Sequence, residues 1–144
     1  MKLKLILLVL FQNILMFSQT EQPNEKYNFD KDCGDGDQQT VNICLSNAVT
    51  KFSKLMEKKY NCIVEYLDSQ IKYYSKDNPE IQAEYIKMKA SLVSSQATWK
   101  KLKEQNSDFY DRGSGTETPM LICQSIIKDY KDRLAWLDNL IEEE

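Results

Sequence analysis

The chain has 144 residues, of which 28% are charged and 42% apolar, and a formal net charge of −3, which fits one globular domain. It contains no histidine, so Ser-His-Asp and Cys-His catalytic sites are excluded, as is the commonest metal ligand. Carboxylate-only hydrolysis remains open in principle, but acidic residues on solvent-facing helix positions are usually solvated charge. The sequence therefore favours a protein that is not an enzyme and needs no cofactor.

The first residues have the layout of a secretory signal peptide. Lys2 and Lys4 precede an apolar run over 5–11, and the small residue Ser18 follows. Polar residues interrupt the apolar run well short of the roughly 20 apolar residues that a bilayer span needs. We therefore expect residues 1–18 to be removed, and the mature protein to be periplasmic or secreted without stable membrane insertion.

Export affects the charge and the redox state of the chain. Loss of Lys2 and Lys4 takes the net charge from −3 to −5. An acidic surface disfavours nucleic acid and anionic membranes and favours a basic protein partner. An even number of cysteines in an oxidising compartment indicates disulfides, and the exported part contains Cys33, Cys44, Cys62 and Cys123.

A polar arm precedes the first predicted helix. Residues 19–36 contain Pro and Gly and show no periodicity, which indicates a flexible arm that ends in a Cys-bearing turn. Asp37 is suited to cap a helix that runs to about Ser75, where Asn78 and Pro79 stop it. Spacings of three and four place on one stripe Val41, Leu45, Ala48, Phe52, Leu55, Lys59, Ile63 and Tyr66.

Two further helices are predicted. The second begins at Pro79 and has a stripe of Ile81, Tyr85, Met88, Leu92, Ser95, Trp99 and Leu102. Residues 106–118, with two glycines, indicate a loop before Pro119 opens the third helix. The stripe of the third helix is Cys123, Ile126, Tyr130, Leu134, Leu137 and Ile141.

The last three residues are acidic and oppose the dipole of the third helix, so this end is expected to fray. No segment alternates with period two strongly enough to indicate a strand. The predicted fold is an all-α, up-down-up three-helix bundle over residues 37–144, with a disulfide-tethered N-terminal arm.

Several short motifs along the chain resemble those of a known family of exported domains. The sequence DQQTVNIC over 37–44 resembles the T-Q-x-x-M-N-x-C that opens that exported domain, and it includes Asn42. Residues 96–99 match Q-x-x-W, and Cys33 falls at the family's first cysteine. The glycine-serine loop, the last cysteine and the closing R-x-x-x-L correspond to Gly113 with Ser114, Cys123, and Arg133 with Leu137.

Together these motifs resemble those of the LprI-like lysozyme-inhibitor domain family over roughly residues 32–140, with two departures. The family's third cysteine would fall near Ser107, where this chain has none, and Cys62 is extra. The family's L-N-x-x-Y region is degraded to residues 56–60, and its basic residue after the Trp corresponds to Lys103. The resemblance implies the fold and export more directly than it implies an inhibitor surface.

Two roles are open for the motif residues Asn42, Gln96, Trp99 and Arg133. The Gln96 amide, adjacent to the stripe of the second helix, is placed to bond a backbone carbonyl or Asn42 across the bundle and so fix the register. Alternatively, Gln96 and Trp99 lie at the mouth of a groove near the loop at 113–115. The first role is favoured because buried amides more often specify packing than function.

The resemblance implies a binding protein that inhibits lysozyme by occlusion, and its acidic charge suits a basic lysozyme. The candidate partner-binding residues are Lys100, Lys101, Lys103, Arg112 and Ser114. Their alternative interpretation is an ordinary solvated face followed by a turn. The competing function is a structural or envelope-maintenance role, in which the bundle binds another envelope protein or itself.

The helix geometry limits the disulfides. In a straight helix Cys62 lies about 27 Å from Cys44 along the axis, whereas Cys33 and Cys123 belong at the same end of the bundle as Cys44. A disulfide requires α-carbons within about 7 Å. We expect Cys33 to pair with Cys44, with Cys44 to Cys123 as the second choice. Cys62 and Cys123 are then expected to be reduced and buried, joined to another chain, or paired with each other if the first helix bends sharply.

Overall fold

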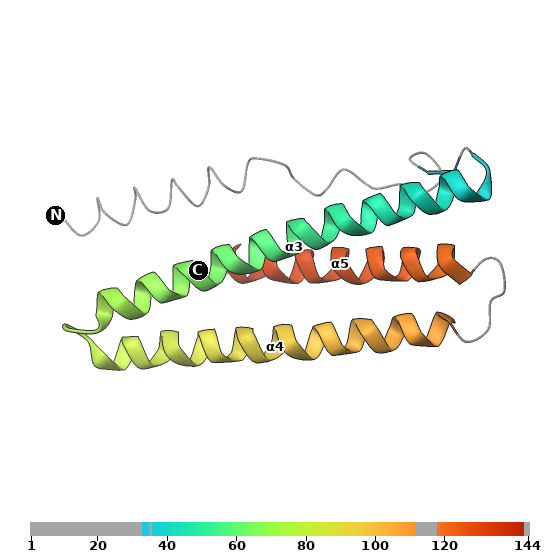
Figure 1. Cartoon of the computed structure of the whole chain (residues 1–144). Coiled ribbons are helices and arrows are strands. Elements are labelled where there is room, and N and C mark those ends of the chain that lie inside the picture. The colour runs from blue at the N-terminus through green and yellow to red at the C-terminus, as the bar shows by residue number, and fades with distance from the viewer. Residues whose placement is uncertain (1–32, 35, 112–117, 143–144) are drawn as a thin grey trace.

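The computed structural model describes residues 33–34, 36–111 and 118–142, and every regular element in these ranges is a helix. Helix α3 spans Gln38–Tyr74, α4 spans Pro79–Asp111 and α5 spans Thr118–Glu142. The helices lie side by side and run up, down and up, and α5 stops short of the turn between α3 and α4 (Figure 1). The all-α, up-down-up bundle is confirmed.

The predicted start and end of the first helix are also confirmed. Asp37 is the N-cap of α3, and its Oδ1 accepts a 2.8 Å hydrogen bond from the Thr40 amide. Ser75 ends the helix. Asn78 then caps α4, and its Oδ1 accepts a 3.4 Å hydrogen bond from the Ile81 amide. Pro79 suits the first turn of α4 because it has no amide hydrogen that would lack a partner there.

The arm is tethered by a disulfide between Cys33 and Cys44, whose α-carbons are 5.7 Å apart. Cys33 is buried in the core. The chain passes closely over the first turn of α3, because a β-carbon on Gly36 would lie 2.9 Å from Thr40 Cγ2. The first-choice pairing is therefore confirmed, and Cys62 and Cys123 are free thiols.

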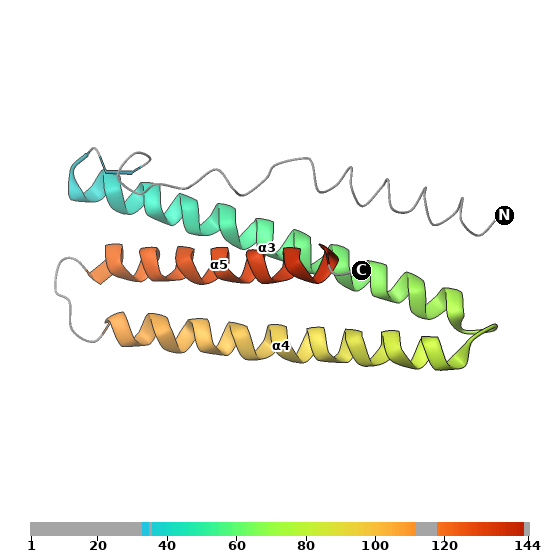
Figure 2. The ribbon, with the colours of Figure 1, turned by 180° about the vertical axis from the view of Figure 1, so that it is seen from behind.

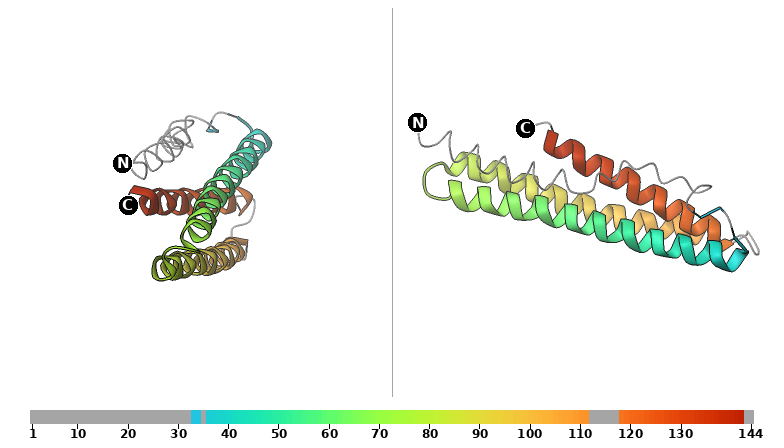
Figure 3. Two further views of the ribbon diagram at one scale, coloured as in Figure 1. Left: turned by 90° about the vertical axis from the view of Figure 1, so that its left-hand side faces the viewer. Right: turned by 90° about the horizontal axis from the view of Figure 1, so that it is seen from above.

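The core lies along one seam between the three helices. Leu45 and Met56 of α3 and Leu137 of α5 are its fully buried side chains. The reverse and end-on views show α5 packed along α3, with α4 alongside both (Figures 2 and 3). The other buried apolar side chains are Val41, Ala48, Phe52, Ile63, Leu67, Leu92, Ile127, Tyr130 and Leu134.

The predicted stripe of the second helix is partly wrong. Met88 and Leu102 are 45% and 53% exposed, respectively, so they lie outside the seam. Lys89, Gln96 and Lys103 lie on the inner side of α4 instead, where each finds a partner on another helix. The inner face of α4 was assigned from apolar residues alone. That assignment is displaced around the helix because it omits polar side chains that have partners inside the bundle.

The predicted loop also begins too early. Helix α4 continues to Asp111, so its last turns include Asn106 and Ser107. Asn106 donates to Asp129 Oδ2 of α5 at 3.4 Å, and the Ser107 hydroxyl donates to the Lys103 carbonyl at 3.0 Å. These contacts keep a polar stretch helical. The Gly113 to Gly115 segment and the expected fraying at 143–144 lie outside the described residues.

A search of the described helices finds none with the length and hydropathy that crossing a membrane requires. The segments 1–18 and 19–32 lie outside the described residues, so the signal peptide and the flexibility of the arm stay predictions.

Candidate functional site

A buried arginine lies between α4 and α5. Arg133 of α5 is only 7% exposed. Its Nε donates to Gln96 Oε1 at 2.9 Å, and its Nη1 donates to Ser95 Oγ at 3.0 Å. The side chain thus crosses from α5 to two adjacent residues of α4.

Gln96 extends this contact to the first helix. It is 4% exposed, and its Nε2 donates to Met56 Sδ at 3.0 Å. Its oxygen is held by Arg133, so one amide links α3, α4 and α5. The partner expected from the sequence is different, because Asn42 Oδ1 accepts from Gln38 Nε2 on its own helix. Asn42 is at the disulfide end of α3, far along the helix from Met56.

Both tryptophans of the chain lie close to the guanidinium. Arg133 Cζ is 4.0 Å from the ring centroid of Trp136 and 5.8 Å from that of Trp99. A cation over an aromatic face is stabilised by the ring quadrupole, more so when it is desolvated. Trp99 also packs against Tyr130, with ring centroids 5.4 Å apart.

The guanidinium has no carboxylate partner among the described residues. Burial lowers the pKa of Arg133, while the nearby Tyr60 raises it, and an arginine still keeps its charge at neutral pH. Its Nη2 is buried and has no hydrogen-bond partner in the part of the chain that the structure describes. Buried charges are normally paired with an opposite charge. Arg133 differs, because its hydrogen-bond partners among the described residues are the neutral side chains of Gln96 and Ser95.

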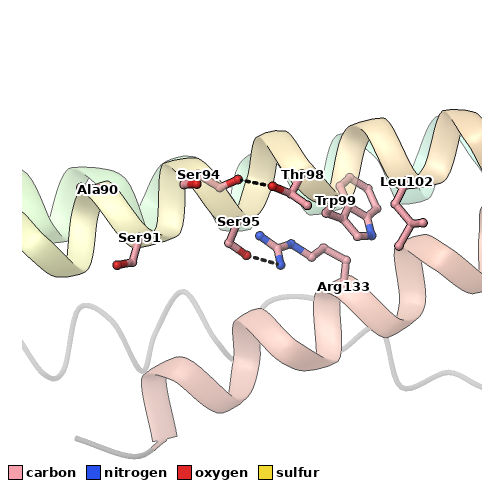
Figure 4. Close-up of a pocket in the computed structure, with 8 residues that line it drawn as sticks. All are labelled: Ala90, Ser91, Ser94, Ser95, Thr98, Trp99, Leu102 and Arg133. Atoms are coloured by element: carbon pink, nitrogen blue, oxygen red, sulfur yellow. Dashed lines mark hydrogen bonds between the residues drawn. The ribbon is translucent and has the colours of Figure 1, made fainter.

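The Arg133 side chain lines a shallow groove between α4 and α5. Figure 4 shows it extending from α5 toward Ser95. Thr98 on the same wall donates its hydroxyl to the Ser94 carbonyl at 3.0 Å. The groove is lined by Ala90, Ser91, Ser94, Ser95, Thr98, Trp99, Leu102 and Arg133, so hydroxyls and an aromatic ring surround one positive charge.

Three of the predicted partner-binding residues, Lys100, Lys101 and Lys103, lie on the described part of α4. Lys100 and Lys101 are exposed on α4. Lys103 is half-buried, and its Nζ lies 3.4 Å from the Tyr130 hydroxyl and 5.1 Å from the centroid of that ring. Lys103 is thus engaged in a contact between helices, while Arg112 and Ser114 lie outside the described residues.

Arg133 and the side chains in contact with it or with Gln96 form the Arg133 cluster, whose other members are Met56, Ser95, Gln96, Trp99 and Trp136. Two of these were not singled out from the sequence. Met56 lies in the region where the family motif is degraded, and Trp136 belongs to no predicted stripe. Trp136 follows Arg133 by three residues, which places both on the same side of a helix. This spacing could have indicated a contact between the two side chains. No group of acidic or cysteine side chains in the described ranges is arranged to hold a metal ion.

Comparison with known proteins identifies a family. A family model described as "Lysozyme inhibitor LprI" matches residues 31–137, from just before Cys33 to Leu137. The match covers α3 and α4 in full and α5 as far as Leu137, so it includes Gln96, Arg133 and both tryptophans. No curated protein and no solved structure matches the chain.

Proposed function

Because the chain belongs to the LprI lysozyme inhibitor family, we propose that it is an exported, non-enzymatic protein that binds lysozyme and occludes its cleft. The observation that carries this proposal is the family match over 31–137. The proposal includes removal of residues 1–18 and a flexible arm over 19–36. The Cys33–Cys44 disulfide is consistent with an oxidising compartment, where such bonds persist.

The acidic charge that suits a basic lysozyme belongs to the segments around the helices. Residues 36–111 and 118–142 contain equal numbers of acidic and basic side chains. The negative charge of the mature chain therefore comes from residues 19–35 and from Glu143 and Glu144. In this proposal the flanking segments attract the basic enzyme, and a neutral bundle makes the contact.

Lys100 and Lys101 are the candidate contacts that the helices keep exposed. They lie toward the C-terminal end of α4, and residues 112–117, with Arg112 and Ser114, follow that end in the chain. Cationic side chains are suited to the carboxylates that line a lysozyme cleft. Lys103 is left out of this surface because it is engaged with Tyr130.

A lysis assay tests the proposal. The purified exported protein is added to a vertebrate-type lysozyme acting on peptidoglycan, and the loss of turbidity is followed. We expect protection that weakens in Lys100→Ala/Lys101→Ala and persists in Lys87→Ala, an exposed lysine nearer the start of α4. Equal protection by both variants would remove the lysine surface from the proposal.

A lack of protection against every lysozyme class tested would contradict inhibition itself. The competing function, a structural protein of the envelope that binds another envelope protein, would then be preferred. Co-purification of the tagged protein from its native envelope would identify that partner.

A further inference from the structure

We propose that the groove between α4 and α5 binds the carboxylate of a small sugar acid, with Arg133 as the cation that receives it. Among the described residues, Lys100 and Lys101 do not line this groove, and the proposal does not depend on lysozyme inhibition.

A guanidinium has five N–H donors, of which one is on Nε and two are on each terminal nitrogen. In Arg133 the Nε donor is used by Gln96 and one Nη1 donor by Ser95, while Nη2 has no partner among residues 33–34, 36–111 and 118–142. The edge formed by Nη1 and Nη2 therefore holds only one neutral acceptor. That edge matches the two oxygens of a carboxylate, which bind it in parallel.

Ser95 controls access to this edge. Its side chain is half-buried at the wall of the groove, and its Oγ accepts a hydrogen bond from Nη1, one of the two nitrogens that a carboxylate would bind (Figure 4). A serine hydroxyl moves between staggered rotamers at little cost. Rotation of Ser95 away from Arg133 exchanges a neutral acceptor for a charged one.

The walls of the groove define the rest of the ligand. Of the described residues that line it, Arg133 alone is charged, which matches a monoanion. Ser91 and Ser94 are exposed, and their hydroxyls are suited to the hydroxyls of a sugar. The half-buried ring of Trp99 and the exposed Leu102 offer apolar surface to the C–H face of a sugar ring.

Tryptophan fluorescence measures binding directly, because both tryptophans of the chain lie against Arg133. The exported protein is titrated with sodium glucuronate, and separately with glucose, at constant ionic strength. We expect a saturable change with glucuronate in the millimolar range and none with glucose. An equal response to both sugars, or no saturable response to glucuronate, would overturn the proposal.

Ser95→Ala distinguishes a binding site from a purely structural arginine. The variant keeps the buried charge and removes the competing hydroxyl, so glucuronate is expected to bind several-fold more tightly. Ser69→Ala is the matched control, since the Ser69 hydroxyl donates to a carbonyl of α3 away from the groove, and it should bind like the parent. Unchanged or weaker binding by Ser95→Ala would show that Ser95 does not compete with the ligand.

Discussion

At the scale of single residues, Gln96 has the largest structural role that the described contacts reveal. Its amide donates to Met56 of α3 and accepts from Arg133 of α5, so its two ends fix the mutual register of three helices. The amide oxygen also stabilises a buried cation, which gives this hydrogen bond more weight than one between neutral groups.

Replacement of Gln96 by leucine keeps the approximate volume and removes both hydrogen bonds. We expect Gln96→Leu to lower the free energy of unfolding by about 2 kcal/mol, because Arg133 Nε is left buried without a partner. Urea denaturation followed by circular dichroism measures the change. Gln105→Leu, at an exposed position of the same helix, should leave stability within about 0.5 kcal/mol of the parent.

The double variant Gln96→Leu/Arg133→Met provides a control on the mechanism. If the cost comes from an unsatisfied cation, removal of the cation should recover part of the loss, so the two single effects are not additive. Strict additivity would mean that Gln96 and Arg133 act independently, contrary to the 2.9 Å contact between them.

The two free thiols should differ in reactivity. Cys62 is exposed, whereas Cys123 is half-buried and its burial raises the pKa of the thiol. Because the thiolate is the reactive form, iodoacetamide near neutral pH should label Cys62 well before Cys123 in the folded protein. Peptide mapping by mass spectrometry measures both rates, and equal rates in the native state would contradict the burial of Cys123.

At the scale of helices, the accuracy of sequence reasoning depends on what fills the inner face. The apolar stripe of α3 correctly predicts most of its core, because Val41, Leu45, Phe52 and Ile63 are buried. In α4 the inner face includes Lys89, whose amine reaches Asp68 of α3 at 2.6 Å. Such partners are distant in sequence, so periodicity alone assigned Met88 to the core incorrectly.

The candidate site was predictable only in part. The motifs singled out Gln96, Trp99 and Arg133, and all three lie in one cluster. Their actual contacts were not predictable, because the partner of Gln96 depends on the register of α3 relative to α4 along their axes. Met56, a flexible apolar side chain with a weak sulfur acceptor, gives no signal of that role in the sequence.

The cap of α3 predicts a pH dependence. The Thr40 amide and hydroxyl hold the pKa of Asp37 below its ordinary value of 3.8. A carboxylate whose pKa is lower in the folded state stabilises the protein above its unfolded pKa, and this stabilisation is lost as the pH falls through the folded pKa. Asp37→Ala should therefore lower the melting temperature at pH 7, and the difference from the parent should shrink below pH 4.

Asp37→Asn separates the cap from the charge. Asparagine also caps helices through its side-chain oxygen, so this variant should melt near the parent at pH 7 and lose the acid-dependent part. Thermal denaturation followed by circular dichroism at pH 3, 5 and 7 makes the comparison. A pH-independent difference between Asp37→Ala and the parent would show that the carboxylate charge is not involved.

At the scale of the whole molecule, the net negative charge lies in the segments that flank the helices. The helices carry balanced charge and hold one another through Lys89 with Asp68, Lys59 with Asp138, and the Arg133 cluster. The excess of acid lies at 19–35 and at the last two residues. Changes to that excess should therefore alter long-range attraction while leaving the bundle intact.

This separation predicts how association with a basic lysozyme responds to charge and salt. Neutralising Glu21, Glu25, Asp30 and Asp32 to the corresponding amides removes four acidic groups from the arm and none from the helices. At low salt the association rate should fall by roughly tenfold, because steering by the summed field is lost. At about 1 M salt, where the screening length is about 3 Å, the variant and the parent should associate with lysozyme at the same rate.

Stopped-flow measurements at both salt concentrations provide the rates, and circular dichroism checks that the fold is unchanged. A difference that persists at high salt would mean that the arm contacts the enzyme directly, and equal rates at low salt would mean that its charge has no part in recognition.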